Sequence, residues 1–298
     1  MDLRLHGKTA LSIELAKKID GKIISADSMQ IYKDMNIGSA KPTNEEMQGI
    51  KHYMIDIVSP EERYSVAEYK ISAKEAIKDV LEKGKIPIVV GGTGLYVNSL
   101  IYEIEYNDIK IDEEYRRKLE KIAEDEGLDK LYEKACKIDP NAMKIISKND
   151  KKRIIRVLEI YKQTGKTKTE LEIESRKKEV EYDYKVFAID MEREVLYNRI
   201  NKRVDIMLHN GLIEEVQNLV KKYGSFPTAM QGLGYKETKM YLDGMITKEE
   251  LEEKIKMETR RYAKRQLTWF RKNKETVWLN GEKTTNENID IIINTISK

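Results

Sequence analysis

The sequence is poor in the residue types that build disulfide or zinc scaffolds. Among 298 residues there is one cysteine, Cys136, and the three histidines are scattered along the chain as His6, His52 and His209. A single cysteine excludes an internal disulfide framework and a Cys-rich zinc module. No apolar run approaches the about 18 residues of a membrane span, and no signal peptide opens the chain. We therefore expect a soluble cytoplasmic protein without membrane contact.

Proline is also scarce, and neither positive nor negative residues are in large excess. The chain holds 5 Pro and 16 Gly, which excludes collagen-like and low-complexity classes. Its 55 Lys and Arg nearly balance 52 Asp and Glu, so the net charge is only +3. This balance excludes a uniformly basic nucleic-acid coat protein, and any polyanionic partner has to meet local basic patches. The hydrophobic fraction of 40% suffices for a packed core, in one large domain or two ordinary ones.

Short β-branched runs alternate with helical periods in the first hundred residues, a pattern typical of a parallel α/β sheet. The spacing predicts strands over residues 22–25, 86–90, 185–189 and 277–279. Helices are predicted over residues 9–18, 65–83, 112–126, 129–137 and 151–163. Because strand signals disappear between residues 112 and 185, we expect an α/β core, residues 1–111 and 181–298, interrupted by a helical insertion domain, residues 112–180.

Gly7, Lys8 and Thr9 stand directly before the first predicted helix. Backbone N–H groups at a helix N-terminus bind phosphate together with a lysine, and a threonine hydroxyl there can hold Mg²⁺. The full phosphate-loop pattern needs a glycine where this chain has Asp2, and no apolar strand precedes Met1. A chance occurrence at a helix start is therefore the alternative. We expect an incomplete N-terminal loop that binds a diphosphate poorly.

Asp27 follows the strand predicted at 22–25, and Thr93 follows the strand at 86–90 within the turn Gly91-Gly92-Thr93-Gly94. Ligands bind at the carboxyl edge of parallel strands in open α/β sheets. A carboxylate at that edge can act as a Mg²⁺ ligand or as a general base, and Thr93 can reach the same crevice. A turn or N-cap aspartate and a plain Gly-Gly turn are the alternatives.

Basic residues gather in two stretches of this nearly neutral chain. Residues 254–274 contain nine lysines and arginines against one acid, Glu258, with three aromatic residues among them. The second stretch comprises Lys148, Lys151, Lys152, Arg153 and Arg156. Like charges at i,i+4 spacing repel each other, so a purely structural helix face would normally alternate in sign. The pattern favours contacts with nucleic-acid phosphates, and a solvated helix face is the alternative.

Five motifs follow one another along the chain. They are ISADSMQIYKDMNIGSAKP at 24–42, GGTGLYV at 91–97, RVDIMLHNGLIEEV at 203–216, QGLGYKE at 231–237 and AKRQLTWFRK at 263–272. In sequence and order they closely resemble the tRNA dimethylallyltransferases, also called isopentenyl-tRNA or IPP transferases, from Gly7 to about Leu279. The chain departs from the family pattern at Asp34, where the family usually has glycine, at Asn36, where it usually has aspartate, and at the phosphate loop.

The resemblance implies an α/β fold with a P-loop NTPase-like parallel sheet core and a helical insertion domain. The family moves a dimethylallyl group from dimethylallyl diphosphate to N6 of adenosine 37, beside the tRNA anticodon. Departure of diphosphate requires Mg²⁺ and positive charge, the adenine has to leave its stack, and its amine has to lose a proton. The implied partners are the tRNA anticodon stem-loop and dimethylallyl diphosphate, the implied cofactor is Mg²⁺, and a monomer is expected.

The resemblance also assigns roles to individual residues. Catalysis is implied for Asp27, as the general base at N6, and for Thr93. Donor diphosphate is implied to bind at Gly7, Lys8, Thr9 and Arg203, with Thr9 also a Mg²⁺ ligand. The adenine pocket is implied at Asp27, Ser28, Met29, Gln30 and Thr93. Further tRNA contacts are implied at Arg116, Lys152, Arg153, Arg156, Gly232, Gly234, Tyr235, Lys236, Lys264 and Arg265.

Two other functions stay open on the residues. A P-loop small-molecule kinase explains Gly7, Lys8 and Thr9 and the α/β core, but it does not explain the basic, Trp-containing stretch near the C-terminus. A catalytically impaired tRNA-binding remnant explains Asp2 at the glycine position of the loop. ATP turnover would identify the kinase, and tight RNA binding without diphosphate release would identify the remnant.

Overall fold

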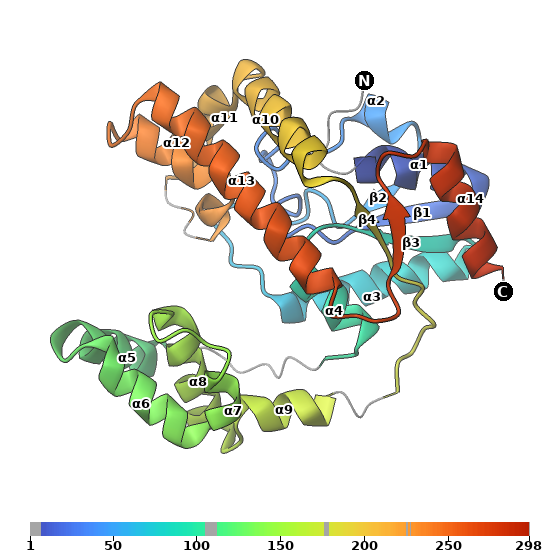
Figure 1. Ribbon diagram of the computed structural model, residues 1–298. Helices are drawn as coiled ribbons and strands as arrows, with labels where there is room; N and C mark the ends of the chain where they lie inside the picture. The colour runs from blue at the N-terminus through green and yellow to red at the C-terminus, as the bar shows by residue number, and fades with distance from the viewer. Residues whose placement is uncertain (1–6, 105–111, 176–178, 225, 227, 298) are drawn as a thin grey trace. The chain divides into compact units, whose positions relative to one another are not determined.

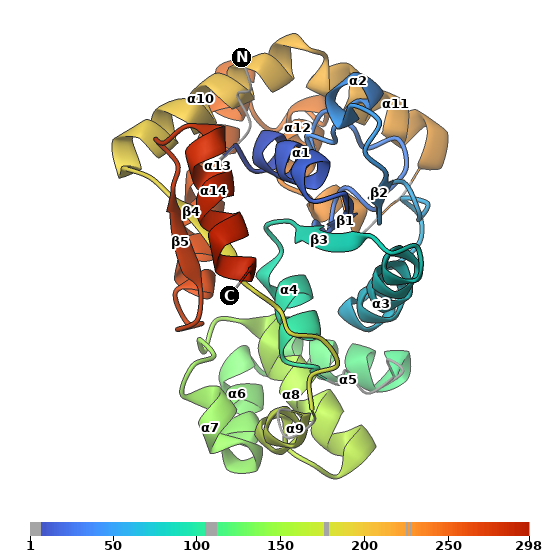
Figure 2. The ribbon, with the colours of Figure 1, turned by 90° about the vertical axis from the view of Figure 1, so that its right-hand side faces the viewer.

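The computed structural model divides the chain into two units (Figures 1 and 2). The α/β unit comprises Met1–Val97 and Tyr184–Lys298, and the helical unit comprises Asn98–Asp183. The structure describes residues 7–104, 112–175, 179–224, 226 and 228–297. The division falls at Asn98, within helix α4 (Gly94–Ile101), rather than at residue 112. The incomplete strand and loop expected at the start of the chain concern residues 1–6, which lie outside the described residues.

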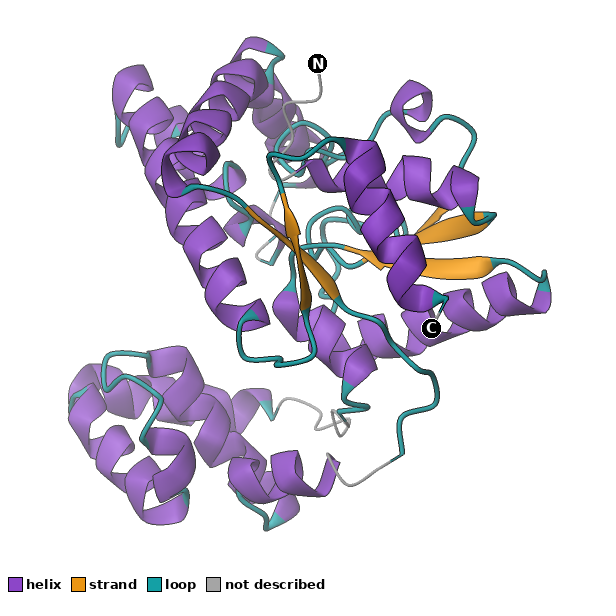
Figure 3. Ribbon diagram, turned by 45° about the vertical axis from the view of Figure 1, so that its right-hand side comes forward, coloured by secondary structure: helices purple, strands orange, loops and turns teal. Residues whose placement is uncertain are grey.

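Short parallel strands form the sheets of the α/β unit (Figure 3). β1 (Gly21–Ser25) lies between β2 (His52–Tyr53) and β3 (Ile86–Val90), and β4 (Phe187–Asp190) pairs with β5 (Val277–Asn280). The four strands predicted from the sequence are confirmed within a residue or two at each end, and β2 was not predicted. Because the register aligns Ser25 with Val90, β1 and β3 end at the same edge of their sheet.

Several helices of the α/β unit begin at sequence-encoded caps. Ser65 before α3, Thr247 before α13 and Thr284 before α14 each form a capping box with a glutamate three residues on. The helices of this unit are α1 (Lys8–Lys18), α2 (Asn44–Met47), α3 (Val66–Glu82), α4, α10 (Arg193–His209), α11 (Leu212–Tyr223), a 3₁₀ turn at Ala229–Gln231, α12 (Tyr235–Leu242), α13 (Lys248–Phe270) and α14 (Thr285–Ile296).

Two apolar clusters pack the chain segments on either side of β1. In Figure 2, α1 lies beside α14, and Leu15 packs with Leu279 and Ile289 in one cluster. A larger cluster joins the segment after β1, through Ile31 and Met35, to α10, α11 and α13. The residues of the motif at 24–42 are therefore anchored to three helices from the second half of the chain.

The helical unit contains α5 (Glu113–Asp125), α6 (Leu128–Ile138), α7 (Pro140–Met143), α8 (Lys151–Thr164) and α9 (Lys168–Ser175). Its described residues hold no strand, and Leu119, Leu131 and Leu158 belong to its buried core. Asp150 caps α8, because its carboxylate accepts a hydrogen bond from the Arg153 N–H. Across the part of the chain that is described, no helix is long and apolar enough to cross a membrane.

Candidate functional site

Asp27 lies immediately beyond the end of β1, and its own loop holds its carboxylate. Asp27 Oδ1 accepts hydrogen bonds from the backbone N–H of Met29 at 2.8 Å and of Gln30 at 3.4 Å. This turn, typical of aspartate, fixes the side chain at the carboxyl edge of the sheet. Among the described residues no group donates to Asp27 Oδ2. The second oxygen is thus the one that can accept a proton from a substrate.

The loop after β3 is tied to the segment after β1. The Thr93 N–H donates to the Ala26 carbonyl at 3.1 Å, and the Ser28 N–H donates to Thr93 Oγ1 at 3.0 Å. The Thr93 hydroxyl in turn donates to Ser28 Oγ at 3.3 Å. Gly91 has no space for a side chain, since a Cβ there would lie 2.1 Å from the Ala26 carbonyl oxygen. The structure therefore brings Thr93 next to the residue that follows Asp27, as the strand-end argument predicts.

Positive charge reaches the site from α1 and α10. Lys8 is the first residue of α1, and Gly7 before it has φ 62°, a left-handed conformation that favours glycine. Burial lowers the pKa of the Lys8 ammonium, Asp27 acts in the opposite direction, and Arg203 on α10 lowers it further. Lys8 therefore lies within electrostatic range of both Asp27 and Arg203. Two cations beside a helix N-terminus form a setting that favours a phosphate group.

The residues present also fit Mg²⁺. Thr9 lies in the first turn of α1, and its hydroxyl makes no hydrogen bond with any described residue, while its carbonyl accepts one from Ser12 Oγ at 2.9 Å. In the described parts of the chain, no group of three or more His, Cys, Asp or Glu residues could hold a metal by itself. Mg²⁺ commonly takes one or two protein oxygens plus substrate phosphates and water, so a lone hydroxyl beside a phosphate site suits it.

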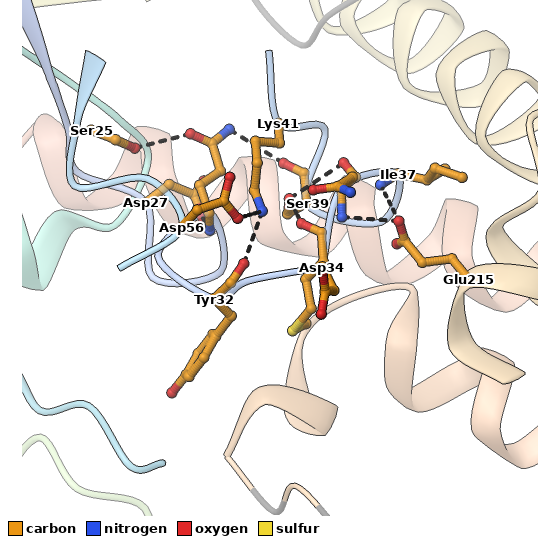
Figure 4. Close-up of polar contacts among 12 residues, drawn as sticks. Ser25, Asp27, Tyr32, Asp34, Ile37, Ser39, Lys41, Asp56 and Glu215 are labelled. Carbon is orange, nitrogen blue, oxygen red and sulfur yellow. Dashed lines mark hydrogen bonds and ion pairs between the residues drawn. The ribbon is translucent and has the colours of Figure 1, made fainter. Parts of the chain in front are cut away.

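The side chain of Gln30 connects β1 to the turn at 39–40, and Figure 4 labels its partners Ser25 and Ser39. Its Oε1 accepts a hydrogen bond from Ser25 Oγ at 2.9 Å, and its Nε2 donates to the carbonyls of Ser39 and Ala40 at 3.4 and 3.3 Å. The amide is thus engaged between β1 and the turn at 39–40. Lys41 adds a second tie, because its ammonium donates to the Tyr32 carbonyl at 2.8 Å and pairs with Asp56.

Glu215 on α11 holds the 36–38 turn of the same segment (Figure 4). Its carboxylate accepts hydrogen bonds from three successive backbone N–H groups, those of Asn36 at 2.9 Å, Ile37 at 2.8 Å and Gly38 at 3.1 Å. Charge-assisted bonds of this kind are about twice as strong as neutral ones. Glu215 was not identified from the sequence, where it is an ordinary acid on a helix.

Tyr235 is a core residue, which corrects its assignment as a tRNA contact. It is 0% exposed, its hydroxyl donates to Glu215 at 2.8 Å and accepts from the Ser39 N–H at 3.1 Å. Burial raises the pKa of Tyr235 well above its ordinary value, and Glu215 adds to the shift, so the hydroxyl stays protonated. Its ring fills the space beside Gly38, where a Cβ would lie 2.4 Å from the ring.

The neighbouring residues of the 231–237 motif divide into buried and exposed positions. Gly232 is buried because Met29 Sδ lies 2.5 Å from the place of a Cβ there, and Gly234 is buried with φ 89°. The exposed Lys236 is the member of this group that can meet a phosphate. Gly232 therefore helps to place Met29, which is half-buried beside Asp27.

Asp34 explains why the family usually has glycine at its position. Its φ of 64° lies in the left-handed region, which residues with a Cβ adopt at a cost. The carboxylate accepts a hydrogen bond from Lys222 at 2.7 Å and one from the Tyr223 hydroxyl. These two bonds lower the pKa of Asp34 below its ordinary value. Asp34 thus forms a tie between the motif at 24–42 and α11.

Fewer residues of the basic stretch 254–274 are available to bind phosphate than its composition indicates. Four of its cations have protein partners: Lys256 with Asp205 and Glu252, Arg260 with Asn201, Arg261 with Glu258, and Arg271 with Asp190. Lys264 and Arg265 are exposed and form no ion pair with any described residue. These two residues of the predicted set are available to a polyanion.

The cations predicted to bind tRNA in the helical unit also divide into paired and unpaired residues. Arg116 donates from Nε and Nη2 to the two carboxylate oxygens of Glu159, at 2.7 and 2.8 Å, and Glu159 is 0% exposed. Arg156 approaches the same carboxylate at 3.5 Å, and Arg153 pairs with Asp150. Lys152 is exposed and has no ion pair among the described residues. Arg116 therefore holds α5 to α8, and Lys152 faces solvent.

α13 contributes two side chains that were not included in the predicted site. Gln266 Nε2 donates to the Gly92 carbonyl at 2.8 Å. The Tyr262 hydroxyl, one helical turn earlier, interacts with the side chains of Gln266 and Thr93. The signal that could have found them is their i,i+4 spacing on a helix face that carries no charge, between the cations of the basic stretch.

Comparison with known proteins places this geometry in a family. The IPP transferase family matches residues 30–273. The chain is 52% identical to the tRNA dimethylallyltransferase of Acetivibrio thermocellus over 278 residues, 93% of this chain and 89% of the relative. It is also 52% identical to the tRNA dimethylallyltransferase of Caldanaerobacter subterraneus over 268 residues, 89% and 85% of the two chains.

Solved structures give the same result. The tRNA isopentenylpyrophosphate transferase of Bacillus halodurans superimposes with a TM-score of 0.73 at 43% identity, over 98% of this chain and 92% of that one. A eukaryotic dimethylallyltransferase acting on tRNA gives a TM-score of 0.77 at 31% identity, over 98% and 77% of the chains. The predicted fold class, an α/β fold with a P-loop NTPase-like parallel sheet core, is confirmed, and the chain belongs to the IPP transferase family.

Proposed function

We propose that this protein transfers a dimethylallyl group from dimethylallyl diphosphate to N6 of the adenosine just 3′ of a tRNA anticodon. We further propose that it works in the cytoplasm as a monomer. The observation that carries the proposal is the convergence of Lys8, Asp27, Thr93 and Arg203 at the carboxyl edge of β1 and β3. Membership of the IPP transferase family supports the reaction class, and the relatives named above act on tRNA.

The donor's diphosphate binds at the N-terminus of α1, between Lys8 and Arg203. An incoming anion stabilises the charged form of Lys8, which burial and Arg203 disfavour in its absence. Both cations then offset the negative charge that develops on diphosphate as the bond between carbon and oxygen breaks. Mg²⁺, held by Thr9 and the diphosphate oxygens, would supply further charge to the leaving group.

The acceptor adenine lies with its N6 amine toward Asp27. A new bond forms between N6 and the dimethylallyl carbon, the bond between that carbon and diphosphate breaks, and the N6 proton passes to Asp27 Oδ2. Asp27 Oδ1 keeps its two backbone hydrogen bonds throughout, so the base does not need to reorganise. The Thr93 hydroxyl is fixed by Ser28, the residue after Asp27, and contacts the reacting centre.

Exposed cations on separate elements bind the RNA backbone. They are Lys152 on α8, Lys236 on α12, and Lys264 and Arg265 on α13. RNA is recognised mainly through backbone phosphates and unstacked bases, so each of these exposed cations can bind a phosphate. The tRNA anticodon stem-loop is the partner that these positions fit.

The test incubates the full chain with dimethylallyl diphosphate, Mg²⁺ and tRNA, and measures diphosphate release and prenylated adenosine in digested RNA. We expect both products in equal amounts. ATP turnover that needs no RNA would support the kinase instead, and tight tRNA binding without diphosphate release would support the remnant.

A further inference from the structure

α13 is seated directly on the loop that carries Thr93. A Cβ on Gly92 would lie 1.9 Å from Gln266 Nε2, and a Cβ on Gly94 would lie 2.4 Å from the indole ring of Trp269. Glycine at both positions is therefore what allows α13 to approach the loop so closely. Gln266 uses this proximity to donate its hydrogen bond to the Gly92 carbonyl at 2.8 Å.

The same helix face reaches the Thr93 hydroxyl. Tyr262 precedes Gln266 by one helical turn, and its hydroxyl interacts with the side chains of Gln266 and Thr93, with Asp27 within electrostatic range. Thr93 Oγ1 has one proton and two lone pairs. The proton goes to Ser28 Oγ and one lone pair accepts the Ser28 N–H, so Ser28 already orients the hydroxyl that lies next to Tyr262.

Burial and the nearby charge of Asp27 raise the pKa of Tyr262 above its ordinary value of 10.0. The phenol is consequently a protonated hydrogen-bond donor across the physiological range, and it cannot act as a second base beside Asp27. What remains for it is a geometric role, because a side chain on a rigid helix next to Thr93 restricts the rotation of the Thr93 side chain.

We propose that Gln266 and Tyr262 are positioning residues: Gln266 fixes the backbone at Gly92, and Tyr262 fixes the Thr93 hydroxyl beside Asp27. The proposal rests on the prenyl transfer proposed above. In this arrangement one turn of α13 has two tasks, since its outer face carries Lys264 and Arg265, and its inner face aligns the reacting centre. Misplacement of a reacting group by about 1 Å can cost about 10²-fold in rate.

The experiment measures single-turnover prenyl transfer at saturating tRNA, together with tRNA Kd, for Tyr262→Phe and Gln266→Met. We expect the rate constant to fall about tenfold for Tyr262→Phe and about 10²-fold for Gln266→Met. The tRNA Kd and its salt dependence should stay within about twofold. Tyr197→Phe is the matched control, because its ring contacts Arg193 and Arg260, and its rate should equal that of the wild type.

A double-mutant cycle separates positioning from a general effect on folding. If Tyr262 acts through Thr93, Tyr262→Phe should cost less than about twofold in a Thr93→Ala background. A tenfold loss that persists in that background, or a wild-type rate in Tyr262→Phe and Gln266→Met, would overturn the positioning role alone. A wild-type protein that forms no prenylated adenosine would instead contradict the proposed function on which it rests.

Discussion

Two glutamates, one in each unit, hold their surroundings with different partners. Glu215 in the α/β unit accepts hydrogen bonds from three backbone N–H groups of the segment that begins at Asp27. Glu159 in the helical unit faces two arginines, Arg116 and Arg156. The first carboxylate shapes a loop of the site, while the second connects two helices.

The difference teaches how charge along the sequence relates to function. In the α/β unit the acids support backbone turns, and the cations near the site, Lys8 and Arg203, lie around Asp27. In the helical unit the cations that composition assigned to RNA are largely paired, and Arg116 is held by a fully buried acid. A basic residue is therefore a phosphate contact only after its partners within the fold are known.

Arg116→Met tests whether Arg116 stabilises the helical unit or binds RNA. We expect it to destabilise the protein by about 3 kcal/mol, because it leaves the buried Glu159 carboxylate with one distant partner. Denaturant unfolding measures the effect, and Arg117→Met, an exposed arginine beside it, is the control with little change. Unaltered stability with a weaker tRNA affinity would assign Arg116 to RNA.

Glu215→Gln tests the role of the corresponding glutamate in the α/β unit. An amide cannot accept all the hydrogen bonds that the carboxylate accepts, so we expect a loss of about 2 kcal/mol in unfolding free energy. The prenyl-transfer rate should fall as well, because the turn at 39–40 supports Gln30 beside Asp27. Glu214→Gln is the matched control at a neighbouring position of α11, and equal behaviour of the two variants would refute the role of Glu215.

Asp139 gives the helical unit a pH dependence of its own. Burial acts to raise the pKa of Asp139, but hydrogen bonds from Thr169 and Ala142 outweigh it, so this pKa lies below its ordinary value. Its stabilisation is therefore full above the ordinary aspartate pKa and is lost as the pH falls through the lower, folded-state value.

The expected result is that Asp139→Asn lowers the unfolding free energy by about 1–2 kcal/mol at neutral pH. The gap to the wild type should shrink once the pH falls below about 4, where the carboxylate of the unfolded chain starts to take up its proton. Denaturant unfolding at a series of pH values measures this gap. A gap that is independent of pH would show that the charge of Asp139 has no part in holding α7 and α9.

The smallest expected effect concerns the exposed face of α13. Lys264→Glu should weaken binding of all tRNAs and reduce the salt slope of log Kd by about 0.7–0.9, because one phosphate is no longer neutralised. Arg261→Glu is the comparison, because Arg261 already pairs with Glu258 and should change the slope less. Equal changes in slope would mean that pairing within the fold does not decide which cations meet RNA.

The sequence predicted the elements whose signals are local. The helical period at 65–83 and the apolar run at 86–90 led to α3 and β3, and strand ends led to Asp27 and Thr93. β2 was missed because two residues carry no periodicity. Residue-level roles came from the motif resemblance, and most of those stay predictions.

Long-range contacts could not be predicted from the sequence. The hydrogen bond between Gln266 and Gly92 joins residues 174 positions apart in the sequence, and no local pattern near either residue predicts it. Tyr235 was assigned to RNA because its motif was considered as a whole, whereas packing against Gly38 buries it. Ion pairs such as that of Arg116 depend on which helix faces come together, which composition does not specify.

The most direct test of the central claim, that Asp27 in the α/β unit performs the chemistry, is single-turnover prenyl transfer by Asp27→Asn. Asparagine keeps the oxygen that accepts from the Met29 and Gln30 N–H groups, so the turn is preserved while the base is lost. We predict a rate about 10²–10⁴-fold below the wild type with tRNA Kd unchanged. A rate equal to that of the wild type would contradict the assignment of Asp27 as the base.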